Sequence, residues 1–106
     1  MIENDVVEVV ITCPDAESSQ SIAAHLIEAR LAACTQAMDR VSSSYRWNGK
    51  VENDPEVRLA IHTRSRLVNE VHTAIDRLHP YDLPCFLVID VKASPGYARW
   101  VAEEVK

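Results

Sequence analysis

Three side chains in this sequence could together bind a soft metal ion. His79 precedes Pro80, and the residue before a proline is held outside the α-helical region, which limits where the imidazole points. Cys85 follows Pro84 on the same short segment, and Cys13 stands at the predicted end of the first strand. Two thiolates and an imidazole suit Cu(I) or Zn²⁺. We therefore predict His79, Cys85 and Cys13 as metal ligands, on condition that they meet, either within one subunit or across a subunit boundary.

Each of these residues also has an ordinary structural interpretation. A histidine at the end of a helix can cap the last carbonyls, and a free cysteine is commonly a small buried hydrophobic side chain. Cys34 completes a set of three cysteines, and no pair has CxxC spacing. The odd count argues against a disulfide framework and against a zinc ribbon. This cysteine usage favours a reducing compartment, so we expect a cytoplasmic protein.

The second informative feature is a predicted β-hairpin with aromatic residues near its tip. Asn48-Gly49 supplies the two positive-φ residues of a type I′ turn. Tyr45 and Trp47 precede this turn in a strand-like alternation, and no part of a small core lies in reach of them. Together with Tyr81 and Trp100 they could line a ligand pocket, although Tyr and Trp are also typical of subunit interfaces.

Catalytic motifs are missing from the sequence. It contains no GxSxG motif, and its two glycines cannot form a glycine-rich phosphate loop. A small hydrolase could use backbone N–H groups after the first strand, but Pro14 has no N–H group and Asp15 repels anions. We therefore rank an enzyme lowest among the functions considered, and we expect no organic cofactor.

The overall composition indicates a globular binding protein. The net charge is −5, from 11 basic and 16 acidic residues, which opposes nucleic-acid binding because phosphates need Lys and Arg. No basic run suggests a membrane surface, and the apolar segment 6–13 is too short to span a bilayer and lacks the features of a secretory signal. Hydrophobic residues make up 47% of the 106-residue chain, so we predict one domain over residues 1–106.

Periodicity predicts the order βαββαβα. The strands are expected at 6–12, 33–47, 51–63 and 85–91, with a bulge near 39–40 in the second. Asp15, Ser65 and Ser94 are the predicted N-caps of the three helices. Two strand–helix–strand units that share an antiparallel sheet form a ferredoxin-like α+β sandwich. Here it has an extended central hairpin and an extra C-terminal helix, and both crossover helices cover the same sheet face.

The other sheet face is less polar than a monomer would leave it. The fourth strand is apolar on both sides, with Phe86 and Val88 opposite Leu87 and Ile89. Strands of this kind are normally buried on both faces, and the last helix is too short to cover the whole sheet. The pattern favours a subunit interface over a monomer.

Three sequence blocks together resemble the CutA family of divalent-cation tolerance proteins. They are LAAC at 31–34, SYRWNGK at 44–50 and LHPYDLP at 78–84, and the late Tyr97 and Trp100 also fit. The resemblance implies a homotrimer that packs its sheets around a three-fold axis, a role in tolerance of divalent cations such as copper, and direct metal binding. Two positions depart from the family pattern: Cys85 replaces a usual Glu, and His62 replaces a common Lys.

A rival interpretation shares the same architecture. In it, the chain is a regulatory trimer that binds a small metabolite in a cleft between subunits and signals to a partner. The two interpretations differ in whether His79 and the cysteines converge.

Overall fold

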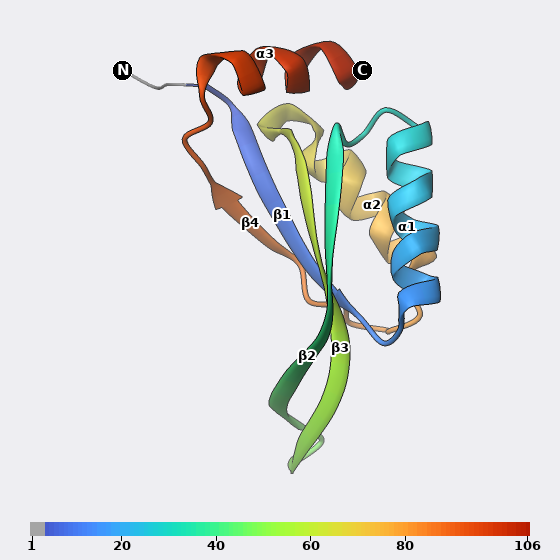
Figure 1. Cartoon of the computed structure of the whole chain (residues 1–106). Coiled ribbons are helices and arrows are strands. Elements are labelled where there is room, and N and C mark those ends of the chain that lie inside the picture. Colours follow the sequence, from blue (N-terminus) through green and yellow to red (C-terminus); the bar gives the residue numbers. More distant parts are fainter. Residues whose placement is uncertain (1–3) are drawn as a thin grey trace.

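Four strands form an antiparallel sheet in the order β2-β3-β1-β4, and two helices cover one of its faces (Figure 1). The computed structural model describes residues 4–106. Its strands are β1 (Val6–Cys13), β2 (Cys34–Trp47), β3 (Lys50–Arg64) and β4 (Leu87–Asp90). Its helices are α1 (Ala16–Glu28), the 3₁₀ turn η1 (Ser65–Leu67), α2 (Val68–Leu78) and α3 (Pro95–Glu104).

This topology confirms the predicted ferredoxin-like α+β sandwich with an added C-terminal helix. β1 and β2 are joined through α1, and β3 lies between them in the sheet. β3 and β4 are joined through α2, with β1 between them. Both crossover helices lie on the same side of the sheet, while α3 crosses one end of it (Figure 1).

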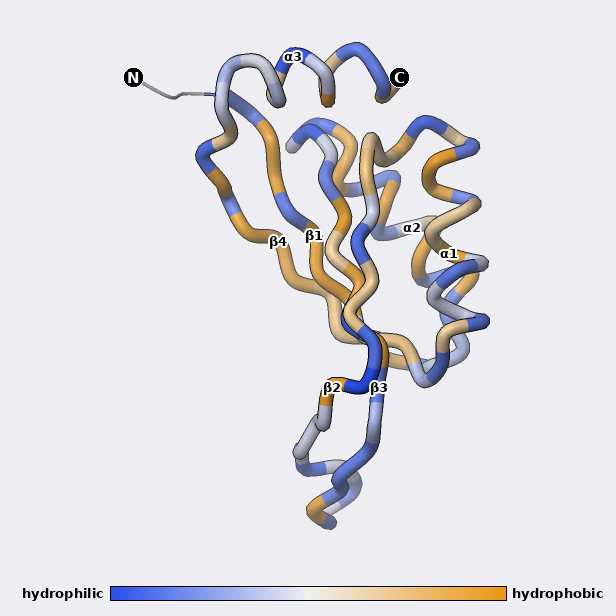
Figure 2. The backbone as a smooth tube through the Cα atoms, viewed as in Figure 1, coloured by the Kyte–Doolittle hydropathy of each residue, from blue (hydrophilic) through white to orange (hydrophobic). Residues whose placement is uncertain are grey.

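The core lies between the sheet and the two crossover helices. Alternate residues of β1 and β3, such as Val9 and Ile61, are fully buried, and they belong to the same cluster as Leu26 of α1 and Ile75 of α2. The period of two in the strands and the helical spacing in α1 and α2 direct these apolar side chains to one layer. Figure 2 shows hydrophobic stretches along β1 and β4 and a mostly hydrophilic hairpin arm.

Two of the three predicted helix caps are confirmed. The Asp15 carboxylate accepts a hydrogen bond from the Ser18 N–H at 2.8 Å, and the Ser94 hydroxyl accepts one from the Tyr97 N–H at 3.4 Å. The prediction for Ser65 is wrong, because the chain first forms the 3₁₀ turn and α2 starts at Val68 without a side-chain cap. Within residues 4–106 no helix has the length and apolar character needed to cross a membrane.

The central hairpin extends well beyond the sheet (Figure 1). Asn48 and Gly49 have φ angles of 51° and 77°, as the predicted type I′ turn requires. The predicted bulge is also present, because the β2–β3 register shifts between Met38 and Val41. Arg40 lies in the bulge with a φ of 60°. Bulges strengthen local twist, which explains why the hairpin arm bends away from the sheet.

The fourth strand is shorter than predicted. It begins at Leu87, because β1 pairs with it only from Val7 to Val10. Cys85 precedes the strand, and Phe86 turns toward the core, where its ring lies 4.5 Å from that of His72. The chain then leaves the sheet edge, where the Asn4 side chain donates a hydrogen bond to the Ala93 carbonyl at 2.9 Å.

The sheet face opposite the two crossover helices, called the open face here, has exposed apolar side chains at its β4 edge. Leu87 is 50% exposed and Ile89 is 39% exposed, and both pair with open-face residues of β1. Val10, on the same face, is already buried within the single subunit. The open face is therefore covered in its centre and at the α3 end, and exposed along β4 and the hairpin.

Candidate functional site

The segment from His79 to Cys85 joins α2 to β4 and lies where the hairpin leaves the sheet. The His79 N–H donates to the Ile75 carbonyl at 2.8 Å and so closes the last turn of α2. His79 itself has an extended backbone (φ −76°, ψ 139°), as expected for a residue before proline. Helix α2 therefore ends at a fixed point, and the segment runs under the base of the hairpin.

The His79 side chain ties this segment to the first strand. Its Nε2 lies 2.8 Å from the Thr12 carbonyl oxygen, and its Nδ1 accepts a hydrogen bond from the Tyr81 N–H at 3.1 Å. A carbonyl only accepts and an N–H only donates, so these partners specify the neutral imidazole with the proton on Nε2. The imidazole does not cap α2, and both of its nitrogens are occupied by protein groups.

Cys13 lies in the hydrophobic core. Its exposed fraction is 0%, and it packs in the main cluster behind β1. Burial, with the nearby carboxylates of Asp15 and Glu56, raises the pKa of the Cys13 thiol to about 11. A thiol with such a pKa remains protonated at neutral pH and is a poor metal ligand in this position.

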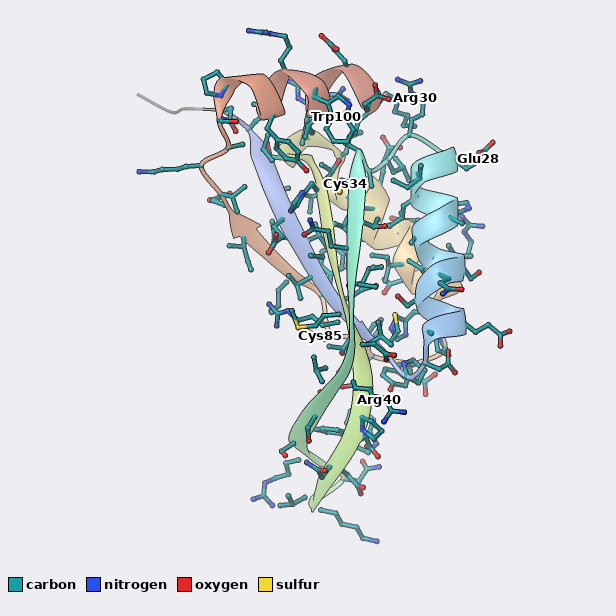
Figure 3. All side chains as sticks on the ribbon, in the orientation of Figure 1. Glu28, Arg30, Cys34, Arg40, Cys85 and Trp100 are labelled. Atoms are coloured by element: carbon teal, nitrogen blue, oxygen red, sulfur yellow. The ribbon has the colours of Figure 1, made fainter. Side chains whose placement is uncertain are left out.

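Cys85, in contrast, is exposed at the base of the hairpin (Figure 3). Within residues 4–106 no three His, Cys, Asp or Glu side chains lie close enough to hold a metal ion. His79, Cys85 and Cys13 therefore do not form a ready site inside one subunit. One thiol is in the core, backbone groups that cannot rotate away hold both nitrogens of the imidazole, and only Cys85 is free to reach a ligand. The set stays a prediction.

A cleft of about 910 Å³ opens beside Cys85, between the hairpin and the 79–85 segment. Its lining consists of Thr12, Ser43, Ser44, Tyr45, Trp47, Glu56, Pro80, Tyr81, Asp82, Leu83, Pro84 and Cys85. Trp47 is 49% exposed and Tyr45 is 42% exposed, so the predicted lack of a core for these aromatics is confirmed. Tyr81 joins them from the loop, so three of the four aromatics predicted as a possible pocket lining do line this cleft. The prediction is wrong for Trp100, which lies on α3 beside Tyr97 at the other end of the sheet.

The polar groups of the cleft are acidic or neutral. The Tyr81 hydroxyl donates to Glu56 at 3.0 Å, and burial together with this bond raises the pKa of Tyr81. The Tyr45 hydroxyl donates to Asp54 at 2.5 Å, and mainly this bond raises the pKa of Tyr45 to about 12. Among the described residues lining the cleft, none is Lys, Arg or His. The cleft therefore suits neutral or cationic ligands better than phosphates or other anions.

A second polar group on the open face was not identified as a site from the sequence. His62 lies between Glu8 and Tyr97, with one ring nitrogen in contact with each. The sequence did contain a signal for this cluster. His62 departs from the family pattern, and the alternation of side chains along the strand places it on the open face. Its partners come from β1 and α3, and a single sequence does not show such long-range contacts.

Comparison with protein-family models matches residues 7–104 to the family "CutA1 divalent ion tolerance protein". The "Divalent-cation tolerance protein CutA" of Pyrococcus horikoshii is 38% identical over 99 residues, which cover 92% of this chain and 96% of that protein. The protein of the same description from Pectobacterium atrosepticum is 35% identical over 98 residues, covering 92% and 89%. The vertebrate relatives are longer: this chain spans 65% of the Danio rerio protein and 52% of the Mus musculus protein.

Solved structures give the same grouping. The crystal structure of CutA from Xylella fastidiosa has a TM-score of 0.94 and 38% identity, covering 97% of this chain and all (100%) of that one. The Archaeoglobus fulgidus protein, described as a periplasmic divalent cation tolerance protein, has a TM-score of 0.92 and 30% identity, with 95% and 99% coverage. Sequence and fold therefore agree over nearly the whole chain.

Proposed function

This chain belongs to the CutA1 divalent ion tolerance protein family, and from this membership we propose that it acts in divalent-cation tolerance as a cytoplasmic homotrimer. The observation that carries the proposal is the exposed apolar surface of the open face and hairpin. Leu87, Ile89 and Trp47 are 50%, 39% and 49% exposed on one subunit. Surfaces of this kind are typical of subunit interfaces. Three free cysteines support the reducing compartment.

The assembly is tested by light scattering coupled to size-exclusion chromatography. The expected mass is about three times the 11.9 kDa of one chain at micromolar concentration. A mass near that of one chain would contradict the homotrimer. The cellular role is tested in a bacterial strain that lacks its own family member and is challenged with copper. Expression of this chain should restore growth, and a well-expressed chain that restores nothing would contradict the role in tolerance.

Direct binding of copper or zinc is the finer part of the proposal. The ligand set predicted from the sequence does not fit a metal ion within one subunit, among residues 4–106. The test compares metal affinity of wild type with that of His79→Ala, Cys85→Ser and Cys13→Ser under reducing conditions. Equal affinity in all four proteins would remove this set from consideration, and loss in a variant would require a rearranged or intersubunit site.

A second candidate function, small-metabolite binding, is favoured by the cleft. Its volume of about 910 Å³ is in the range of small-molecule sites, and aromatic rings with a few carboxylates line it. The lining favours a neutral or cationic metabolite. Thermal-shift screening should find stabilisation by aliphatic amines and none by nucleotides. Stabilisation by nucleotides alone would contradict this account of the cleft.

A further inference from the structure

A chain of short hydrogen bonds crosses the open face beneath α3. His62 Nδ1 lies 2.6 Å from the Tyr97 hydroxyl, and His62 Nε2 lies 2.8 Å from the Glu8 carboxylate. The three residues come from β3, α3 and β1. The imidazole is well covered, with a side-chain exposure of 15%, and that of Glu8 is 29%. The group is therefore a structured polar cluster at the opposite end of the sheet from the hairpin.

The protons in this cluster can be assigned from its partners. The Glu8 carboxylate only accepts, so Nε2 of His62 carries the proton and donates to it. In the neutral imidazole Nδ1 is then the acceptor, and the Tyr97 hydroxyl donates to it. The lone pair of Nδ1 thus points toward Tyr97, while the carboxylate holds the ring from behind. A carboxylate–histidine pair of this form is the usual support of a metal-binding imidazole.

A thiol lies on the same side of the sheet. Cys34 is the direct cross-strand partner of His62, so their side chains share the open face with Cβ atoms about 5 Å apart. The thiol is half-buried and also neighbours the Tyr97 hydroxyl. The Trp100 ring lies 5.5 Å from that of Tyr97, and Figure 3 shows Cys34 and Trp100 at the α3 end of the sheet. The Cys34 thiol and the His62 imidazole thus both neighbour the Tyr97 hydroxyl, beside α3.

We propose that Cys34 and His62 form a binding site for a thiophilic metal ion, Cu(I) foremost, with Glu8 as the residue that orients the imidazole. The Cys34 thiol releases its proton to solvent and its sulfur binds the ion. His62 Nδ1 supplies the second ligand as the Tyr97 O–H, which keeps its proton, turns away. No electron is transferred, because the ion arrives and stays as Cu(I).

The ligand count selects the metal. Cys34 and His62 are the only two candidate ligands here, because Glu8 binds the far nitrogen of the imidazole, and among residues 4–106 no group of three His, Cys, Asp or Glu side chains could hold a metal ion. Structural Zn²⁺ takes four ligands in a tetrahedron, whereas Cu(I) is soft and accepts one sulfur and one nitrogen. The proposal rests on the role in cation tolerance for its biological purpose, and on the geometry alone for its chemistry.

The test is competition for Cu(I) between the purified protein and a chromogenic chelator under reducing conditions. We expect Cys34→Ser and His62→Lys to weaken binding at least 100-fold. His62→Lys is the sharper variant, because an ammonium keeps a charge partner for Glu8 but offers no lone pair. Glu8→Gln should weaken binding roughly 10-fold, as loss of a supporting carboxylate does. His72→Lys, on the exposed side of α2 and outside both proposed metal sites, is the matched control and should bind as wild type does.

X-ray absorption at the copper edge provides a readout independent of affinity. Wild type should show one sulfur and one nitrogen neighbour, and the sulfur signal should vanish in Cys34→Ser. Circular dichroism establishes that each variant is folded. Unchanged affinity in folded Cys34→Ser or His62→Lys would overturn the site, as would loss confined to Cys85→Ser. Failure to restore growth by a protein that binds Cu(I) through Cys34 would instead count against the cellular function alone.

Discussion

The Tyr81 hydroxyl donates a hydrogen bond to the Glu56 carboxylate at 3.0 Å and so joins the 79–85 segment to the base of the hairpin. Glu56 is 8% exposed. Burial of a carboxylate without a partner costs free energy, and the hydrogen bond from Tyr81 offsets this cost. Because His79 holds the same segment to β1 through Thr12, the loop is attached on two sides. The cleft wall is therefore preformed in a single subunit.

Tyr81→Phe should lower the free energy of unfolding by about 1 kcal/mol, because the buried Glu56 carboxylate loses the hydrogen bond that the partly exposed Tyr81 donates. Urea denaturation at a fixed chain concentration measures it. Tyr45→Phe is the matched control, since it removes the same hydroxyl from the exposed pair with Asp54. A larger loss in Tyr45→Phe than in Tyr81→Phe would contradict the structural role of the bond to Glu56.

Trp47→Ala should weaken subunit assembly more than it weakens the subunit fold. The side chain is 49% exposed in one subunit, so its truncation removes little core packing. If a neighbouring subunit covers it, the loss at that contact should be about 2 kcal/mol or more. Dissociation on dilution, followed by light scattering, measures the effect. Arg46→Ala, next to it on the other side of the strand, serves as control and should dissociate as wild type does.

His79→Ala should lower the free energy of unfolding by about 2 kcal/mol, because two hydrogen bonds of about 1 kcal/mol each are lost at a buried position. Hydrogen exchange locates the effect: the Tyr81 amide, which donates to His79 Nδ1, should lose protection. His72→Ala on the exposed side of α2 is the control. Unchanged protection of the Tyr81 amide in His79→Ala would show that the loop is held by other contacts.

The three thiols should react at different rates. At pH 8 a Cys13 thiol with a pKa of about 11 is ionised in about one molecule in a thousand, and it is also buried. Cys85 should react first with a disulfide reagent, Cys34 more slowly, and Cys13 only on unfolding. Mass spectrometry after timed quenching assigns each site. Fast labelling of Cys13 in the native protein would contradict its place in the core.

The raised pKa of Cys13 also predicts a pH dependence of stability. A group whose pKa is higher in the folded state contributes stability that is complete below its unfolded pKa near 9 and is lost as pH rises toward 11. The free energy of unfolding should therefore fall across this interval. Cys13→Ala should reduce that slope, and an identical slope in both proteins would contradict the assignment.

The sequence predicted most of the fold because its strongest signals are local. Asn48-Gly49 specified the turn, and helical spacing specified the faces of α1 and α2. The errors concern places where tertiary contacts decide. Ser65 looked like a cap but lies in a 3₁₀ turn, where its N–H donates to the Asp5 carbonyl. The fourth strand is short because β1 offers it only four partners.

The candidate sites were harder to predict for the same reason. The stiffness of the segment before Pro80 was correctly inferred, but the direction of the His79 imidazole depends on Thr12, 67 residues away. Likewise, nothing near Cys13 in the sequence shows that its side chain faces the core instead of the cleft. The partners of His62 come from positions 8 and 97, so the residue type was noted while its cluster was not.

The bulge in β2 determines the side of the hairpin from which Tyr45 and Trp47 project. Met38, before the bulge, pairs with Arg58, and Tyr45, beyond it, pairs with Glu52, so an even-numbered and an odd-numbered residue project from the same side. One extra residue thus inverts the parity of the strand. Unbroken alternation of the same residues from Met38 onward would send Tyr45 and Trp47 to the opposite side, whereas deletion of Arg40 would remove the bulge and leave both aromatics where they are. Their orientation is encoded by a count of residues and is independent of their chemical type.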